Sequence, residues 1–283
     1  MAKRLRRSAA TRLIEGSSPS LCFKIMAKIL IIKEKKETIN GREHTVIKET
    51  QYYIEDTGKD IQTKYGKIPK KELEKPAGST IKSTTNKEFQ IINADYIDIY
   101  KRIKKLPQTI PLKDLGVIAG ETGLNKNSEV VDAGLGSGAA TIFFANICKK
   151  VTSYEIREDH IKAAKENIKK TGLKNITIKK KDITKQIDEK NIDFIMLDLP
   201  NPWEALGNAE KALRTGGFLA SYSPSIIQTR DFVEKLSEQD KMLHIKTIEV
   251  MQRNWEVNKR KVRPKSIEIG HSGFITIARK IKT

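Results

Sequence analysis

The chain is poor in cysteine, it has fewer acidic than basic residues, and it contains no long hydrophobic run. Its 283 residues include two cysteines, Cys22 and Cys148, which lack the spacing of a metal-ligand or redox pair. We therefore expect no metal site, no disulfide framework and a reducing, cytoplasmic location. No apolar stretch reaches the length of about 18 residues that indicates a membrane-spanning helix, so we expect no membrane partner.

Acidic residues are outnumbered by basic ones. The sequence has 54 Lys and Arg against 35 Asp and Glu, which gives a net charge of +19 and a pI near 9.7. This excess favours a polyanion such as a nucleic acid as the partner. An anionic small substrate, a membrane surface or a Lys-rich solvated surface would fit the same charge, so charge alone does not choose among them.

The first 25 residues are rich in Arg and Ser and nearly free of acidic residues. This composition is open to three interpretations: a transit peptide, an RNA-binding arm, or an upstream extension before a second start at Met26. We exclude this basic extension from the fold. Residues 26–92 then alternate short apolar stretches, such as 28–32 and 44–54, with turn residues. This pattern predicts a small β-rich domain.

From residue 93 onward, short apolar strands alternate with helical patterns. The pattern predicts strands at 130–133, 151–154, 176–178, 194–197, 217–222, 242–250 and 274–278, and helices at 94–104, 137–148, 158–170 and from near Trp203 and Ile226. Such alternation is typical of a parallel, doubly wound sheet in an α/β domain, here residues 93–283.

A glycine-rich turn follows the strand at 130–133. Its order, Gly134-x-Gly136-x-Gly138, differs from the dinucleotide fingerprint Gly-x-Gly-x-x-Gly. The carboxylate of Asp132 before the turn suits a cationic ligand better than a pyrophosphate. S-adenosylmethionine carries an amine and a sulfonium and would fit this turn. The alternative is that the turn binds no ligand and only connects the strand to the helix.

Acidic residues also end the next two strands. Glu155 lies where a ribose diol is gripped in nucleotide-binding α/β folds. His160 follows in the first turn of a helix and would either border an adenosine or lie on the surface. Asp182 ends the third strand, where it would accept a hydrogen bond from an adenine amino group or cap a helix.

Asp198 ends the fourth strand, at the sheet edge where open α/β sheets place their sites. The Pro-x-Pro loop after it leads to Trp203, which would either stack on a base or pack on the sheet. The basic run Lys259, Arg260, Lys261 and Arg263 would hold a phosphate backbone or form a solvated loop.

These motifs resemble the archaeal and bacterial tRNA (adenine-N1)-methyltransferases of the T-loop type, over residues 28–281. The resemblance rests on 104–114, the glycine turn, 153–157, 198–203, Arg263-Pro264 and 271–274. One departure is Pro111, which stands where the family usually has Tyr or His before Pro-Lys-Asp. A ring that would hold the base there is missing.

The resemblance implies a class I, Rossmann-like seven-stranded sheet, a homotetramer, S-adenosylmethionine as cofactor, and tRNA adenine 57 or 58 as target. It implies that Asp198 is the catalytic residue, and our hypothesis is that Asp198 polarises the base by accepting a hydrogen bond from its exocyclic amine. Combined with the residue patterns, the predicted cofactor contacts are Gln108, Asp132, Gly134, Leu135, Gly136, Ser137, Gly138, Ala139, Glu155, His160, Asp182 and Asp198. The predicted RNA contacts are Trp203, Lys259, Arg260, Lys261 and Arg263.

Two other functions remain open at this point. One is a different class I methyltransferase that acts on a protein or a small molecule, and the other is a non-catalytic RNA-binding subunit. The sequence after Asp198 lacks the Asp/Asn-Pro-Pro-Tyr motif of amino-group methyltransferases. Methylation of a ring nitrogen is therefore favoured over methylation of an exocyclic amine.

Overall fold

The structure is a computed structural model that describes residues 27–39, 42–258, 261–267 and 270–283. Residue contacts divide the chain into two compact units, Met1–Ala94 and Asp95–Thr283. Residues 1–25, including Cys22, lie outside the described residues, so their three interpretations stay untested. Cys148 is a buried free thiol. Among the described residues, no helix is both long and apolar enough to cross a membrane.

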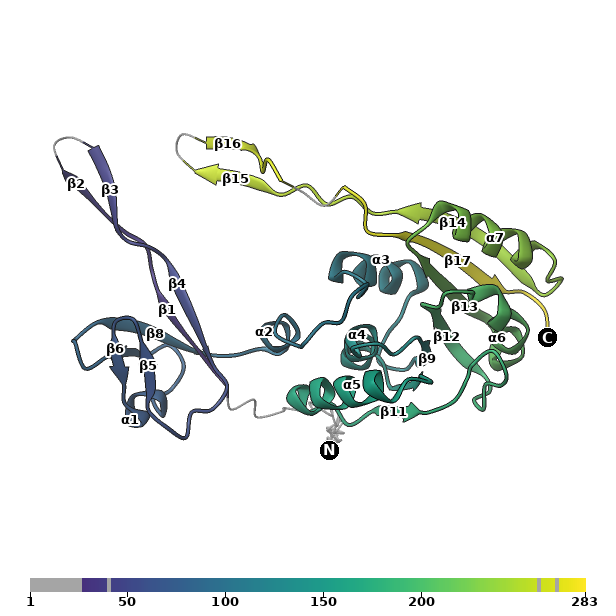
Figure 1. Cartoon of the computed structure of the whole chain (residues 1–283), viewed down its shortest axis with the longest axis horizontal. Coiled ribbons are helices and arrows are strands. Elements are labelled where there is room, and N and C mark those ends of the chain that lie inside the picture. Colours follow the sequence, from purple (N-terminus) through teal and green to yellow (C-terminus); the bar gives the residue numbers. More distant parts are fainter. Residues whose placement is uncertain (1–26, 40–41, 259–260, 268–269) are drawn as a thin grey trace, which may run out of the picture. The chain divides into compact units, whose positions relative to one another are not determined.

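The first unit is built on a four-stranded antiparallel sheet with the order β4-β1-β8-β7 (Figure 1). Its core side chains include Leu30, Ile81 and Phe89, so the β-rich prediction is confirmed. The stretch 44–54 is divided between two strands, because the chain leaves β3 at Lys48 and enters β4 at Thr50. The elements are β1 Lys28–Ile32, β2 Lys35–Ile39, β3 Arg42–Ile47, β4 Thr50–Ile54, β5 Ile61–Thr63, β6 Gly66–Ile68, α1 Lys70–Leu73, β7 Thr80–Lys82 and β8 Glu88–Asn93.

The second unit contains a seven-stranded sheet with the order β11-β10-β9-β12-β13-β17-β14. The strands are β9 Glu129–Ala133, β10 Lys150–Tyr154, β11 Ile176–Lys179, β12 Ile192–Leu197, β13 Leu213–Ser223, β14 Met242–Glu249 and β17 Phe274–Lys280. The predicted α/β sheet is confirmed, but it is mixed rather than wholly parallel, because β17 runs antiparallel to both its neighbours. The chain returns from β14 to β17 without a crossover helix, and such a return produces antiparallel neighbours.

Helices cover both faces of this sheet (Figure 1). They are α2 Tyr96–Tyr100, α3 Leu112–Thr122, α4 Ala139–Ile147, α5 Glu158–Thr171, η1 Pro202–Ala205, α6 Leu206–Ala212 and α7 Ile226–Ser237. Strand β12 shows why there are two layers of core. Phe194 and Met196 pack into one buried cluster, while Ile195 and Leu197 pack into the other. Successive side chains of a strand point to opposite faces, so an apolar run is buried on both.

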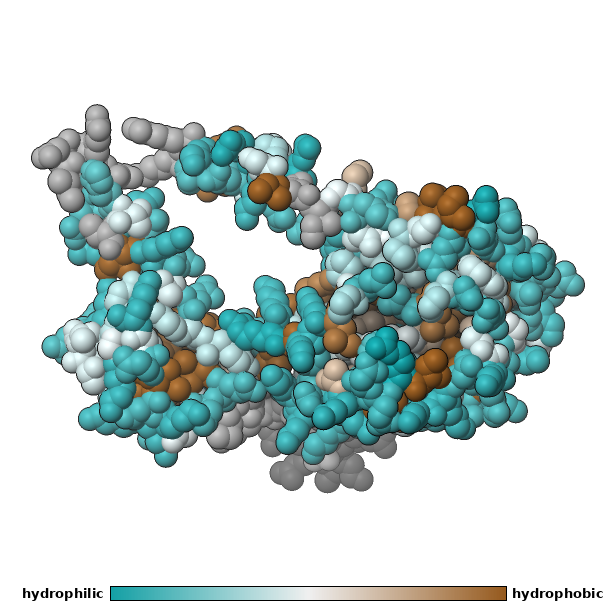
Figure 2. All heavy atoms as spheres, viewed as in Figure 1, coloured by the Kyte–Doolittle hydropathy of each residue, from teal (hydrophilic) through white to brown (hydrophobic). Residues whose placement is uncertain are grey.

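Three features of this unit differ from the predictions. Helix α3 was not predicted, and α2 is much shorter than the predicted helix at 94–104. A third feature is a hairpin of β15 Trp255–Asn258 and β16 Lys261–Pro264 (Figure 1). In the chain it lies between β14 and β17, and it is not part of their sheet. Hydrophilic residues dominate the visible surface of the second unit (Figure 2).

Candidate active site

Three neighbouring strands end at the same level of the sheet. The last residue of β9, Ala133, pairs with Tyr154 of β10 and with Leu197 of β12. The residues that follow them, Gly134, Glu155 and Asp198, therefore start three adjacent loops at one edge. This is the carboxyl edge of the parallel strands, where ligands bind in open α/β sheets.

The glycine turn has a backbone that only glycine accommodates easily. Gly134, Gly136 and Gly138 have φ values of 89°, 51° and 79°. A Cβ atom on Gly134 would lie 2.0 Å from the carbonyl oxygen of Asp198, and one on Gly138 would lie 3.1 Å from the Cβ of Ala164. Positive φ and close approach both select glycine here. The turn leads directly into α4, with Gly138 as its N-cap residue.

Glu155 holds this turn against the end of β10. Its carboxylate accepts hydrogen bonds from the backbone N–H groups of Gly136 (3.2 Å), Ile156 (2.9 Å) and Arg157 (3.0 Å). Nδ1 of His160, in the first turn of α5, lies 3.1 Å from the same carboxylate. The structure thus brings together the predicted Glu155, His160 and glycine turn.

Asp132 is a buried carboxylate beneath the turn. One oxygen accepts a hydrogen bond from Thr141 Oγ1 at 2.5 Å and lies 3.4 Å from Ser153 Oγ. The other, Oδ1, is buried without a partner among the described residues. Burial raises the pKa of Asp132 to about 6. An incompletely compensated carboxylate is expensive to bury, and it fits a positively charged ligand at the adjoining turn.

No described residue donates a hydrogen bond to the side-chain carboxylate of Asp198. Its backbone N–H donates to the carbonyl of Ala133 at 2.8 Å, which fixes the start of the loop. Its side chain is half-buried and has no hydrogen-bond partner among the described residues. Burial, with the nearby charge of Asp132, raises the pKa of Asp198 to about 8. The carboxylate does not cap its own loop, so it is available to a ligand.

The loop after Asp198 is held in place by a residue of helix α7. Nε2 of Gln228, on α7, donates to the carbonyls of Leu199 (3.1 Å) and Pro200 (2.5 Å). Trp203, in η1, is half-buried and packs against the core cluster beneath it. This packing fits the structural interpretation of Trp203, and the residue stays partly exposed.

The other predicted cofactor contacts lie at the rim of the same edge. Asp182 follows β11 and accepts hydrogen bonds from the backbone N–H (3.0 Å) and hydroxyl (2.7 Å) of Thr184, and no helix begins there. Gln108 is exposed in a turn, with φ of 62°. Its neighbour Thr109 has its hydroxyl 3.3 Å from that of Ser137 in the glycine turn. Leu135, Ser137 and Ala139 are buried within the turn and the start of α4.

The predicted RNA contacts are only partly described. Lys259 and Arg260 lie outside the described residues. Lys261 and Arg263 lie on β16 with 57% of each side chain exposed, and both lie within 4 Å of Glu256, at 3.7 and 3.4 Å. Pro111 is the N-cap residue of α3.

The site also includes a residue that the sequence patterns missed. Tyr222 is buried near the end of β13, whose Ser221 pairs with Leu197. Its hydroxyl donates to Asp114 at 3.0 Å. Burial, with the charges of Asp114 and Asp198 as further causes, raises the pKa of Tyr222 well above its usual range. Its position at a strand end beside Asp198 was the signal that could have identified it.

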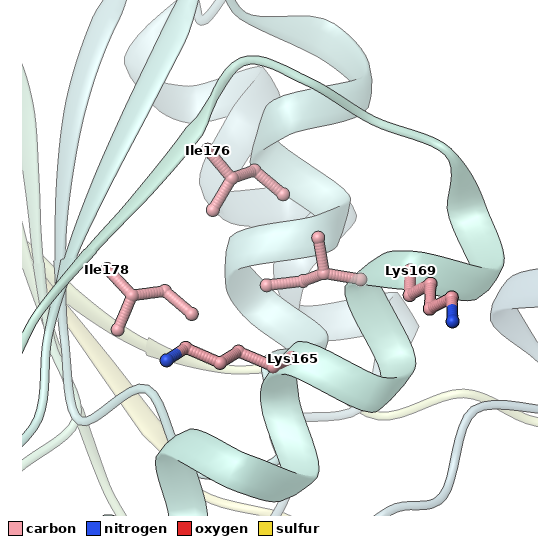
Figure 3. A pocket seen from close by; sticks show the side chains of 5 residues that line it. Lys165, Lys169, Ile176 and Ile178 are labelled. Atoms are coloured by element: carbon pink, nitrogen blue, oxygen red, sulfur yellow. The ribbon is translucent and has the colours of Figure 1, made fainter.

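Two further features lie outside this arrangement. An open hollow between α5 and β11 is lined by Lys165, Ile168, Lys169, Ile176 and Ile178 (Figure 3). It contains none of the predicted site residues. Over the described parts of the chain, no cluster of three or more His, Cys, Asp or Glu has the arrangement of a metal site.

Comparison with known proteins decides the family. The family model described as "tRNA methyltransferase complex GCD14 subunit" matches residues 103–280. The chain belongs to this family. TrmI of Methanocaldococcus jannaschii, a tRNA (adenine(57)-N(1)/adenine(58)-N(1))-methyltransferase, is 33% identical, over 81% of this chain and 91% of that protein. TrmI of Thermus thermophilus, a tRNA (adenine(58)-N(1))-methyltransferase, is 27% identical, over 77% of this chain and 87% of its own.

Solved structures of the same fold confirm the class I architecture of the family. A SAM-dependent O-methyltransferase from Thermotoga maritima superposes with a TM-score of 0.76 at 27% identity, covering 92% of this chain and 95% of its own. The tRNA (m1A58) methyltransferase TrmI of Aquifex aeolicus gives a TM-score of 0.72 at 22% identity, covering 90% and 97%. The resemblance drawn from the sequence motifs is therefore confirmed.

Proposed function

We propose that this protein transfers the methyl group of S-adenosylmethionine to N1 of adenine 58 in the T-loop of tRNA, with adenine 57 as a second candidate target. Membership of the tRNA methyltransferase family supports the reaction class, and both TrmI relatives carry position 58 in their names. The observation that carries the proposal is the carboxylate of Asp198, which lies beside the glycine turn and has no hydrogen-bond partner among the described residues. That pairing places an acceptor for a base next to a cradle for a cofactor.

The residues at the strand ends fit S-adenosylmethionine. The carboxylate of Asp132, whose Oδ1 has no partner among the described residues, would suit a cationic ligand, and the glycine turn would admit that ligand close to the backbone. Glu155 would hold the ribose hydroxyls, with His160 beside it, and Asp182 would accept a hydrogen bond from the adenine amino group. Gln108 and the turn residues 134–139 would complete the contacts. The bound cofactor supplies an activated methyl group, so that positioning does most of the remaining work.

Asp198 is the proposed catalytic residue. The target adenine must leave its stack to reach the sheet edge. The carboxylate of Asp198 would accept a hydrogen bond from the exocyclic amine of that adenine and raise the electron density at N1. As the new N1–C bond forms, positive charge moves onto the ring, and the negative carboxylate stabilises it. Trp203 and the basic residues of β16 would hold the RNA.

Three finer assignments belong to the same proposal. Residues 26–92 are assigned as the small β-rich domain and 93–283 as the methyltransferase domain, a division supported by the two compact units. The homotetramer, which the motif resemblance implies, and the cytoplasmic location, which the spacing of the two cysteines favours, are further parts of the proposal. Sedimentation of the purified full-length chain would measure the assembly directly.

Methylation of unmodified bulk tRNA with labelled S-adenosylmethionine tests the function. We expect nuclease-sensitive label that maps, after digestion to nucleosides, to 1-methyladenosine at the T-loop. Label on protein, on a small molecule or on an exocyclic amine would contradict the proposal in favour of another class I methyltransferase. Binding of tRNA without any methyl transfer would indicate the non-catalytic RNA-binding subunit.

Replacing Glu155 by Ala is expected to weaken binding of S-adenosylmethionine by about 1.5–3 kcal/mol, the range for hydrogen bonds to charged groups. The change removes the proposed ribose acceptor and the acceptor of the Gly136 N–H. Titration calorimetry measures the affinity. Glu158→Ala is the matched control, because Glu158 is exposed and pairs with Lys180 on the surface. Equal affinities for the two variants would remove Glu155 from the site.

Binding of tRNA is expected to weaken steeply as salt rises, because phosphate contacts release counterions. In the double variant Lys261→Gln/Arg263→Gln, the slope of log K against log salt should fall by about 2, or about 1 for each lost phosphate contact. Arg230→Gln/Lys235→Gln on α7 is the matched control, since these residues are equally basic, exposed and paired with acids. A flat salt dependence, or the same slope in both variants, would contradict the assignment.

A further inference from the structure

Lys113 is the centre of a polar cluster inside the second unit. Its ammonium group donates to Asp114 Oδ1 (2.7 Å), to the carbonyl of Val250 (2.7 Å) and to Ser272 Oγ (2.6 Å). Its side chain is 17% exposed and that of Asp114 is fully buried. A lysine has three N–H donors, so each of them has an acceptor.

Asp114 completes the cluster on its other side. Its second oxygen, Oδ2, accepts hydrogen bonds from Ser272 Oγ at 2.8 Å and from Tyr222 at 3.0 Å. The ion pair is thus satisfied by hydrogen bonds from all sides. A buried ion pair contributes little net stability compared with apolar residues of similar size.

Two partners of Lys113 lie at the two ends of the connection between β14 and β17. Val250 follows the end of β14, and Ser272 lies shortly before the start of β17. The described residues between them, 251–258, 261–267 and 270–271, include β15 and β16, and we call them the hairpin arm. Lys113 binds the first end through a carbonyl and the second through a hydroxyl, so its side chain bridges the base of the arm, alongside the contact of His271 with Glu249.

The same cluster extends to the carboxyl edge of the parallel strands, where Asp198 lies. Tyr222 belongs to β13, the strand beside β12, and Asp198 follows the last residue of β12. The hydrogen bonds run from Ser272 through Asp114 to Tyr222. The arm that carries Lys261 and Arg263 is therefore fastened to the strand that neighbours the proposed catalytic carboxylate.

We propose that Lys113 and Asp114 are positioning residues that fix the base of the hairpin arm relative to Asp198, so that RNA held by the arm presents its target base to the site. This inference rests on the proposed function. The pair does not touch the reacting atoms. It acts through Ser272 and Tyr222, and its contribution appears in how well the enzyme uses tRNA.

Ser272→Ala is the variant that tests this, since replacing Lys113 would leave Asp114 buried without its counterion and could unfold the protein. We expect KM for tRNA to rise about fivefold, as for coupled residues of one network. The affinity for S-adenosylmethionine should stay unchanged. Thr276→Val is the matched control, because it removes one hydroxyl bond, to Thr247 at 3.0 Å, from the same β17 region. Equal KM values for the two variants would overturn the inference.

A second measurement separates positioning from general loosening of the structure. Ser272→Ala is combined with Lys261→Gln/Arg263→Gln, in which the arm has lost two of its cations. If the serine acts through the arm, it should add no further increase in KM in that background. An equal fold-increase in both backgrounds, or a wild-type KM for the double variant, would overturn the inference. A wild-type enzyme that methylates no tRNA would overturn the proposed function, and this inference with it.

Discussion

Asp198→Asn is expected to lower kcat for tRNA methylation by roughly 10²-fold or more, the loss measured when one preorganised electrostatic group is removed. The amide is nearly the same size as the carboxylate, so the loop should keep its shape. The amide lacks the negative charge that would stabilise the developing positive charge on the adenine ring. If, as proposed, the interaction strengthens in the transition state, kcat should fall while the affinity for tRNA stays similar.

The structure makes this variant an informative test. The side chain of Asp198 accepts no backbone N–H among the described residues, so a capping role that Asn could share is absent. Unfolding curves and S-adenosylmethionine titrations should show a folded variant that binds the cofactor. Near-normal turnover in such a variant would end the catalytic assignment of Asp198.

The pH profile provides a control on the same residue. Burial raises the pKa of Asp198 to about 8 in the free protein, so the carboxyl group is mostly protonated at neutral pH. In the proposed mechanism the carboxylate is the active form, so kcat/KM for S-adenosylmethionine should rise as the pH increases toward 8. The Asn variant should lose this rising limb. A wild-type profile without a limb between pH 6 and 8 would show that another group controls the rate.

Gly134→Ala is expected to lower the free energy of unfolding by about 2–5 kcal/mol, the combined cost of backbone strain and overpacking. The new Cβ would lie 2.0 Å from the carbonyl oxygen of Asp198, and that oxygen belongs to rigid backbone. Either the glycine turn or the Asp198 loop must move. The same movement should abolish detectable methyl transfer, because it separates the cofactor cradle from the carboxylate. Denaturant unfolding and a methylation assay measure the two effects.

Gly136→Ala is the matched control for stability. Gly136 also has a positive φ, 51°, but its Cβ would come no closer than 3.8 Å to the carbonyl oxygen of Gly134. This variant carries only the cost of the left-handed conformation, on the order of 1 kcal/mol. If the two alanines destabilise the free protein equally, the close approach of the two loops is not what requires glycine at Gly134.

The sequence was a good guide to the site wherever the signal is local. The glycine turn, Glu155 and Asp198 each follow a short apolar strand, and parallel strands bring such ends to one edge. Their meeting could therefore be predicted without knowing a single long-range contact. The structure adds what no pattern shows, namely that Glu155 binds the turn itself and that, within the described parts of the chain, the Asp198 carboxylate has no hydrogen-bond partner.

The positioning cluster could not be predicted in the same way. Ser272 lies 158 residues from Asp114 in the chain, and Tyr222 lies 108 residues from it. Local periodicity contains no information about such pairings, although the family motifs did single out Lys113-Asp114 and 271–274. Helix α3 was missed because it follows Pro111 and contains two glycines, which weaken a helical pattern. The direction of β17 depends on its return from β14, a matter of topology that composition does not determine.

The pair of acidic residues at the cofactor edge has a consequence for the lifetime of the protein. Asp132 and Asp198 both have raised pKa values, about 6 and about 8. A carboxyl group whose pKa is raised by folding destabilises the fold as the pH increases above its ordinary value, here over the range from about 4 to about 8. A cation bound beside the two carboxylates reverses that loss, and any ligand of the native state adds stability by mass action. The folded population, and with it resistance to proteolysis in the cell, should then follow the supply of the methyl donor.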